Sequence, residues 1–210
     1  IAVEARSSEY VDSKSGVSAR LTISAYENLL SAVERRVLIN NESKAVVRLS
    51  DFYGLIPSIT GKVELVYEGE QEGPAIVAQD LIGKAIRSLF INYFPDPDKV
   101  RKLKERNPYK HIIDWFGEGH ELDLLNDISQ KEYRKTLDSV PGLKELVNKN
   151  QKDADEDARF FLMEFALHGL TEYSMLSKKN LVAGLQFKDL LSSMFSDKTA
   201  ESGEEDKNEG

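Results

Sequence analysis

The sequence contains no cysteine among its 210 residues. This absence excludes disulfide bonds, thiolate metal sites and cysteine nucleophiles, and it is typical of proteins from a reducing compartment. No apolar run approaches the roughly 18 residues that a membrane-spanning helix needs. A formal net charge of −8 argues against non-specific binding to nucleic acid or to anionic lipid. We therefore expect a cytoplasmic protein without a nucleic-acid or membrane partner.

Several sequence motifs that mark enzymes are also missing. The chain has neither the G-x-x-x-x-G-K-[ST] loop that holds nucleotide phosphates nor the G-x-G-x-x-G turn of dinucleotide-binding folds. It also lacks the G-x-S-x-G turn of serine hydrolases and the H-E-x-x-H pair of zinc proteases. The chain thus cannot cradle nucleotide phosphates by itself, and we assign no catalytic residue. Because it opens on a helix-like segment without an initiator methionine, we interpret it as the C-terminal piece of a longer protein.

The histidines offer one conceivable metal site. His111 and Asp114 lie three residues apart on one face of an expected helix, and His120 and Asp123 follow with the same spacing. Two histidines and two carboxylates are a possible ligand set, which would make the protein a metal-dependent hydrolase. The alternative is that all four are surface groups at a helix end, and we predict no metal ligand. We interpret His168 as a residue near a helix C-terminus, where the helix dipole favours its charge.

Apolar residues recur mostly with helical spacing, and we predict an all-α fold. In the first long helix the face expected to be buried consists of Ile23, Tyr26, Leu30, Val33 and Val37. The expected helices cover residues 22–39, the segment that begins at Ser50 and bends at Pro57, and residues 76–94, 97–106, 108–117, 129–139, 141–149, 155–170 and 185–195.

Two segments without apolar residues divide the chain. Residues 68–74 are charged and contain two glycines and a proline, so we expect a domain boundary there. Residues 196–210 contain no apolar side chain larger than that of Ala200, and we predict a disordered acidic tail. Between these segments, an aromatic-rich helix is expected to build one core from Trp115, Phe160, Phe161 and Phe165.

A short segment ahead of the first long helix has the composition of an anion-binding site. Gly16 gives the backbone freedom, Ser18 is a suitable N-cap, and Arg20 follows at the start of the helix. An anion at this position would meet a guanidinium group together with the positive end of the helix dipole. The alternative is an arginine that pairs with a nearby acid such as Asp12. The sequence alone leaves both readings open.

This segment resembles the sensor-2 region of AAA+ ATPases, in particular the branch of magnesium-chelatase-subunit-I-like and MoxR-like proteins. Members of that branch carry a glycine, a small residue, a serine or threonine, one further residue and an arginine ahead of a long helix. Residues 16–20 match this pattern. The resemblance continues through Leu49, Ser50 and Asp51 to Leu65 and covers roughly the first third of the chain.

The resemblance implies a specific organisation and role. Residues 1–73 would form the helical lid subdomain of an AAA+ ATPase, and residues 74–195 a helical C-terminal extension. Arg20, positioned by Gly16 and Ser18, would contact the γ-phosphate of ATP in the full-length protein. ATP and Mg²⁺ would be the cofactors there, and the fragment would hold none. The partners would be other subunits of an AAA+ ring and a protein that the machine remodels, with metal insertion as one possible activity.

A different class of function is compatible with the same sequence. The chain could be a stand-alone helical interaction module with no nucleotide role. The two hypotheses differ in what precedes the chain in the full gene, because only an ATPase needs a phosphate loop and an Mg²⁺-holding aspartate upstream.

Overall fold

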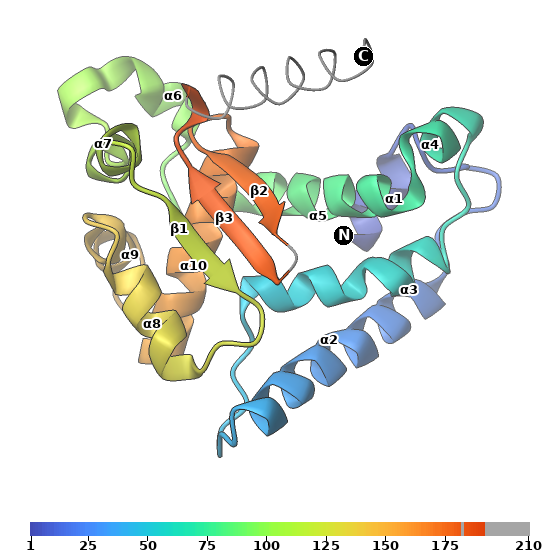
Figure 1. Ribbon diagram of the computed structural model, residues 1–210. Coiled ribbons are helices and arrows are strands. Elements are labelled where there is room, and N and C mark those ends of the chain that lie inside the picture. Colours follow the sequence, from blue (N-terminus) through green and yellow to red (C-terminus); the bar gives the residue numbers. More distant parts are fainter. Residues whose placement is uncertain (182, 192–210) are drawn as a thin grey trace, which may run out of the picture.

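The computed structural model describes residues 1–181 and 183–191, and this part of the chain is mostly helical (Figure 1). None of its helices is long and apolar enough to cross a membrane. Its helices are α1 (Ala2–Ser7), α2 (Ala19–Ile39), η1 (Leu49–Leu55), α3 (Ile56–Thr60), α4 (Tyr67–Glu72), α5 (Pro74–Phe90), α6 (Pro97–Val100), η2 (Arg101–Arg106), α7 (Lys110–Gly117), α8 (Gln130–Asp138), α9 (Leu143–Asn150) and α10 (Glu156–Glu172). Its strands are β1 (Leu122–Leu125), β2 (Ser177–Leu181) and β3 (Gly184–Lys188).

The strands correct the expectation of an all-α fold. They form one antiparallel sheet in the order β1-β3-β2, with Leu124 paired to Leu185 and Lys178 to Phe187. The predicted helix over residues 185–195 is therefore wrong for residues 185–188. Leu185 and Phe187 are both buried, at the spacing of two that a strand requires. Residues 192–195 and the predicted tail 196–210 lie outside the described residues.

Helix α2 confirms the predicted helix over residues 22–39, but its predicted buried face is wrong for the N-terminal half of the helix. Ile23, Tyr26 and Leu30 are exposed, whereas Val33 is buried. The helix packs onto η1 and α3 through a neighbouring face, which includes Leu21. The apolar residues of α2 therefore extend beyond the face of the helix that the rest of the chain covers.

The predicted bend at Pro57 is present as a restart of the helix. The 3₁₀ helix η1 ends at Leu55, and α3 begins at Ile56 with the proline in its first turn. Proline is tolerated there because the first turn of a helix leaves its backbone N–H groups without intrahelical partners. This restart lets η1 and α3 pack side by side with α2 (Figure 1).

In the segment predicted as a domain boundary, residues 68–74, the first five residues belong to helix α4. Two acids in its first turn favour the helix start. Gly69 packs against Tyr10 so closely that a Cβ atom would lie 2.6 Å from the Tyr10 carbonyl oxygen. Gly73 then turns the chain with a φ of 104° and leads directly into α5. One cluster of buried apolar residues continues across this point, from α1 to the sheet.

The centre of the molecule is the contact between α5 and α10 (Figure 1). The helices approach so closely at Gly169 that a Cβ atom there would lie 2.0 Å from the ring of Phe90. Phe165 stacks on Phe90 with ring centroids 5.8 Å apart. Phe90 and Phe165 both belong to the central cluster of buried apolar residues.

The expected aromatic core is confirmed in part. Phe160 and Phe165 are each 5% exposed and belong to the central cluster. Phe161 and Trp115 are only half-buried and pack on its edge. Trp115 stacks on the ring of His120, with centroids 4.6 Å apart.

Candidate functional site

The segment ahead of α2 has the local geometry that its sequence suggests. Gly16 adopts a left-handed conformation with a φ of 66°, which turns the chain toward the helix. The hydroxyl of Ser18 accepts a hydrogen bond of 3.2 Å from the backbone N–H of Arg20 and so caps α2. Arg20 lies in the first turn of a 21-residue helix with its side chain exposed.

The guanidinium group of Arg20 makes no ion pair with any described residue. Asp12, the acid considered as its partner, accepts hydrogen bonds from the Lys14 backbone and the Ser15 hydroxyl instead. An exposed arginine beside the capped start of a long helix can meet an anion with both its planar donors and the helix dipole. The geometry therefore agrees with the anion-binding reading of this segment.

The structure does not bring the four candidate metal ligands together. Asp114 pairs with Lys110 at 2.5 Å, and Asp123 lies on β1, where it accepts a hydrogen bond from Gln186. The Nδ1 atom of His120 lies 2.8 Å from the Trp115 carbonyl oxygen. Residues 1–181 and 183–191 contain no group of three or more histidine or acidic side chains placed to hold a metal ion.

A buried polar cluster in α10 escaped the sequence analysis. Glu164 is fully buried and accepts hydrogen bonds from the backbone N–H groups of Leu49 and Ser50, at 2.7 and 2.8 Å. The hydroxyl of Tyr133 donates a third hydrogen bond of 2.7 Å. Burial raises the pKa of Glu164, while these hydrogen bonds act in the opposite direction. The available signal was that Glu164 is the single charged residue in the otherwise apolar stretch 160–167, because a buried acid must find hydrogen-bond partners.

His168 lies one turn further along α10 and contradicts its predicted environment. It is fully buried, with the ring of Phe187 at 5.0 Å, and neither ring nitrogen has a hydrogen-bond partner among the described residues. Burial holds its pKa well below the usual value, and the charge of Lys178 acts in the same direction. The imidazole is therefore neutral and does not act as a charged group at a helix terminus.

Two buried arginines, Arg36 and Arg48, add further polar contacts around η1. Arg36 binds the carboxylate of Asp51 through Nε and Nη2, at 3.2 and 2.9 Å. Arg48 donates to Gln130 and lies 4.3 Å from the centroid of the Tyr133 ring. Burial lowers the pKa of Arg48 to about 10. The first 73 residues and the helices α8 and α10 are thus held together by buried hydrogen bonds as well as by apolar contacts.

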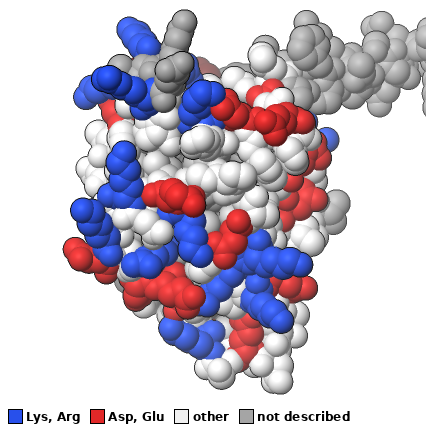
Figure 2. Space-filling model, turned by 90° about the vertical axis from the view of Figure 1, so that its left-hand side faces the viewer, with Lys and Arg blue, Asp and Glu red and all other residues white. Residues whose placement is uncertain are grey.

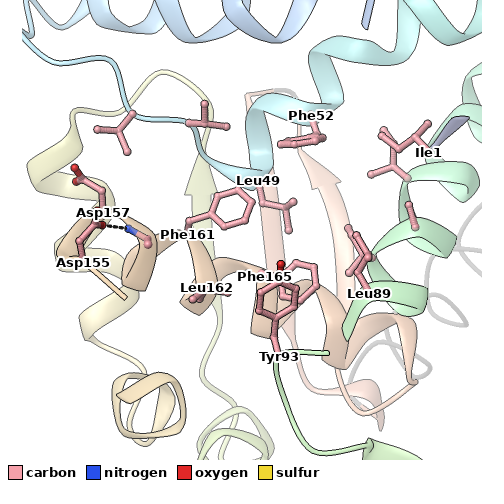
Figure 3. A pocket seen from close by; sticks show the side chains of 16 residues that line it. Ile1, Leu49, Phe52, Leu89, Tyr93, Asp155, Asp157, Phe161, Leu162 and Phe165 are labelled. Carbon is pink, nitrogen blue, oxygen red and sulfur yellow. Dashed lines mark hydrogen bonds between the residues drawn. The ribbon is translucent and has the colours of Figure 1, made fainter. Parts of the chain in front are cut away.

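An apolar cleft of about 570 Å³ opens between α5, α10 and η1 (Figure 3). Phe52, Leu89 and Phe161 line its walls, each from a different helix. Asp155 and Asp157 lie at one end of the cleft, where Asp155 caps α10 through a hydrogen bond of 2.8 Å to the Ala158 N–H. The volume and the mostly apolar walls are typical of sites that take a small molecule or the side chains of a partner.

The face that carries α7, α8 and α9 has a mixed charge (Figure 2). Lysine and arginine side chains alternate there with aspartate and glutamate. Arg134, for example, bridges Glu156 and Asp157 at 2.8 and 2.6 Å. Paired charges of this kind characterise the face, which presents no field of a single sign.

No family model, no curated protein and no solved structure matches this chain. Its function must therefore be inferred from its own side chains. The informative features are the exposed arginine at the start of α2, the cleft between α5 and α10, and the buried polar cluster around Glu164.

Proposed function

We propose that this chain is the lid and partner-facing segment of an ATP-driven remodelling machine of the AAA+ type, of the chelatase-like and MoxR-like branch that its sequence resembles. One observation carries the proposal. Arg20 stands exposed and without an ion pair to any described residue, at the capped start of a long helix. An arginine held in this way is ready for an anion that the chain itself does not supply.

The chemistry of the γ-phosphate suits this position. A guanidinium group offers planar paired donors to phosphate oxygens, and the helix start adds a partial positive charge. ATP would bring the phosphate to Arg20, and hydrolysis would remove it. The change in charge would then bias the position of α2 relative to the nucleotide-binding core.

The remaining parts of the nucleotide site belong to the full-length protein under this proposal. The chain has no phosphate loop, and the described residues contain no group of three or more histidine or acidic side chains placed to hold a metal ion. Purified chain should therefore not hydrolyse ATP. Reproducible turnover in a preparation free of contaminating ATPases would contradict the lid role.

The buried polar cluster supports the transmission of movement to a partner. Glu164 bonds the backbone at Leu49 and Ser50, and Arg48 bonds Gln130 at the start of α8. A displacement of α2 and η1 would thus be passed to the extension as the motion of a single body. The extension would then act on the remodelled protein, with metal insertion as one candidate activity.

The residues encoded before Ile1 in the full gene test this proposal directly. We expect a phosphate loop followed by an acidic Walker-B strand. An upstream sequence that lacks both motifs would contradict the ATPase proposal.

A second candidate, a helical interaction module without a nucleotide role, is favoured by the apolar cleft between α5 and α10. Its walls from Phe52, Leu89 and Phe161 would accept apolar side chains of a partner. The sequence encoded upstream distinguishes the two candidate functions, because an interaction module requires no nucleotide-binding motifs there.

A further inference from the structure

Helix α6 and the 3₁₀ helix η2 carry a strongly basic stretch of an otherwise acidic chain. Residues 99–106 contain five lysines and arginines and one glutamate, whereas the whole chain has a formal net charge of −8. Arg101, Lys102 and Arg106 are exposed, and we call the surface that they form the η2 patch. Figure 2 shows lysine and arginine side chains gathered at the upper end of the molecule, the end at which Figure 1 places α6.

The cations of the η2 patch have no acidic partner among the described residues. Lys102 and Arg106 form no ion pair there, and neither does Arg101. The Nη2 atom of Arg101 donates instead to the carbonyl oxygens of Tyr173 and Ser174, at 2.6 and 3.0 Å. Neutral carbonyl groups position the guanidinium group and leave its charge uncompensated.

Two acids that precede the η2 patch in the chain are already engaged. Asp98 pairs with Arg87 at 3.2 Å, and Asp96 pairs with Lys99 at 3.4 Å. Asp96 also caps α6 by accepting a hydrogen bond from the Asp98 N–H. These two carboxylates therefore have basic partners of their own outside the patch.

Strand β3 carries the chain toward the η2 patch. Lys188, the last residue of β3, is paired with Ser177 of β2. Ser177 lies three residues after Ser174, whose carbonyl oxygen accepts the hydrogen bond from Arg101. Three residue steps and one ladder spacing put Lys188 within roughly 20 Å of the Arg101 guanidinium group. Figure 1 shows the red end of the described chain at the same end of the molecule as α6.

An acidic segment follows within reach of the patch. Residues 201–206 contain no basic residue and four acids, Glu201, Glu204, Glu205 and Asp206. The thirteen residue steps from Lys188 to Glu201 can span up to roughly 45 Å, which exceeds the separation from the patch. Because segment and patch belong to one chain, the tether gives the segment an effective concentration that is roughly millimolar. An acidic segment of another protein has no such advantage.

We propose that the acidic segment 201–206 binds the η2 patch and covers its three cations. A single exposed ion pair contributes little, but several charges on a tethered segment act together. Charge attraction requires no folded structure in the segment, so the contact agrees with the composition of residues 196–210. While bound, the segment withholds the patch from acidic segments of other proteins. The contact is separate from the role proposed for Arg20 and does not depend on it.

A nitroxide label on the 210-residue chain tests the proposal. The sequence contains no cysteine, so Ser202→Cys gives a single labelling site inside the acidic segment. The label should reduce the amide NMR signals of Lys102 and Arg106 in about 0.1 M salt. The signals of Lys131 and Lys135, two exposed lysines of α8, should keep their intensity because Figure 1 places α8 at the opposite end of the molecule. Salt at about 1 M, which shortens the Debye length from about 10 Å to about 3 Å, should restore the lost signals.

Charge variants of the labelled chain identify the surface that is used. Lys102→Glu, Arg106→Glu should restore the signals of η2, while the matched control Lys131→Glu, Lys135→Glu should leave them reduced. Arg101 is retained in both variants because it holds the backbone after α10. Unchanged circular dichroism and thermal midpoints establish that each variant is folded.

A further variant neutralises the segment and keeps its length. It carries Glu201→Gln, Glu204→Gln, Glu205→Gln and Asp206→Asn. The signals of Lys102 and Arg106 should keep their full intensity in this labelled variant, because the segment has lost the charges that attract it to the patch.

Three outcomes would overturn the proposal. In the first, the label reduces the signals of Lys102 and Arg106 no more than those of Lys131 and Lys135. In the second, the reduction persists when the segment is neutral. In the third, unlabelled chain enriched in ¹⁵N loses the same signals when it is mixed with nitroxide-labelled chain, which would assign the patch to the acidic segment of a second copy.

Discussion

The carboxylate of Glu164, in the middle of α10, accepts a hydrogen bond of 2.7 Å from the backbone N–H of Leu49, which lies 115 residues earlier in the chain. Its second oxygen accepts from the next N–H, that of Ser50. Glu164 thus caps the start of η1 from another helix, in a region without access to solvent. This contact ties the segment that contains Arg20 to the extension.

Replacing this carboxylate should destabilise the fold. Glu164→Gln puts an amide group opposite one of two backbone donors, and a buried donor without an acceptor costs about 1–3 kcal/mol. Urea denaturation measures the loss of unfolding free energy. Glu156→Gln, at a glutamate that is 70% exposed on the same helix, is the matched control and should have little effect. Equal losses in the two variants would show that the buried carboxylate contributes nothing specific.

His168 should make the fold sensitive to acid. Above pH 6.5, the ordinary value of its pKa, the imidazole is neutral in both folded and unfolded chains. Below this pH the unfolded chain takes up a proton that the buried imidazole refuses, so stability falls as pH falls, by up to about 1.4 kcal/mol per pH unit. The raised pKa of Glu164 acts oppositely, since its folded form retains a proton as the pH rises above 4.5.

Unfolding free energies between pH 5 and 8 separate these contributions. His168→Leu should remove the loss on the acid side, while the exposed histidine variant His111→Leu should retain it. An acid-side slope that persists in His168→Leu would contradict this assignment.

The close approach of α5 and α10 predicts a steric effect at Gly169. Gly169→Ala places a methyl group within 2.0 Å of the Phe90 ring, and such overpacking costs about 1–3 kcal/mol. Gly117→Ala is the control, because an added Cβ atom there meets no neighbour within 4 Å. Thermal unfolding should show a lower midpoint only for the Gly169 variant. An unchanged midpoint for Gly169→Ala would mean that α5 and α10 can move apart without loss of stability.

Phe165 and Phe161, two of the three phenylalanines of α10, should differ in how much they stabilise the fold. Phe165 is 5% exposed and packs against Phe90, so Phe165→Ala should cost about 3–5 kcal/mol. Phe161 is half-buried at the edge of the cleft, and Phe161→Ala should cost clearly less. Denaturant titrations of the two variants measure the difference. A larger loss of unfolding free energy for Phe161→Ala than for Phe165→Ala would contradict the placement of Phe165 in the core.

Helical spacing, the cap at Ser18 and the restart at Pro57 could be predicted from the sequence because they depend on neighbouring residues. The sheet could not, because strand β3 spans only Gly184–Lys188 and its period of two competes with the helical spacing of Phe187 and Leu191. The buried face of α2 was missed because periodicity shows that a face is apolar and does not show which neighbour covers it. The partners of Glu164 depend on contacts across more than a hundred residues.

ATP hydrolysis by the full-length protein with and without Arg20 tests the central claim most directly. Arg20→Ala should lower kcat by orders of magnitude, Arg20→Lys should restore little because it lacks the planar fork, and the stability of the chain should be unchanged. Arg35→Ala, at an exposed arginine of the same helix, should hydrolyse ATP at the normal rate. Normal hydrolysis by Arg20→Ala, or a loss of activity explained by unfolding of the chain, would contradict the proposed contact with ATP.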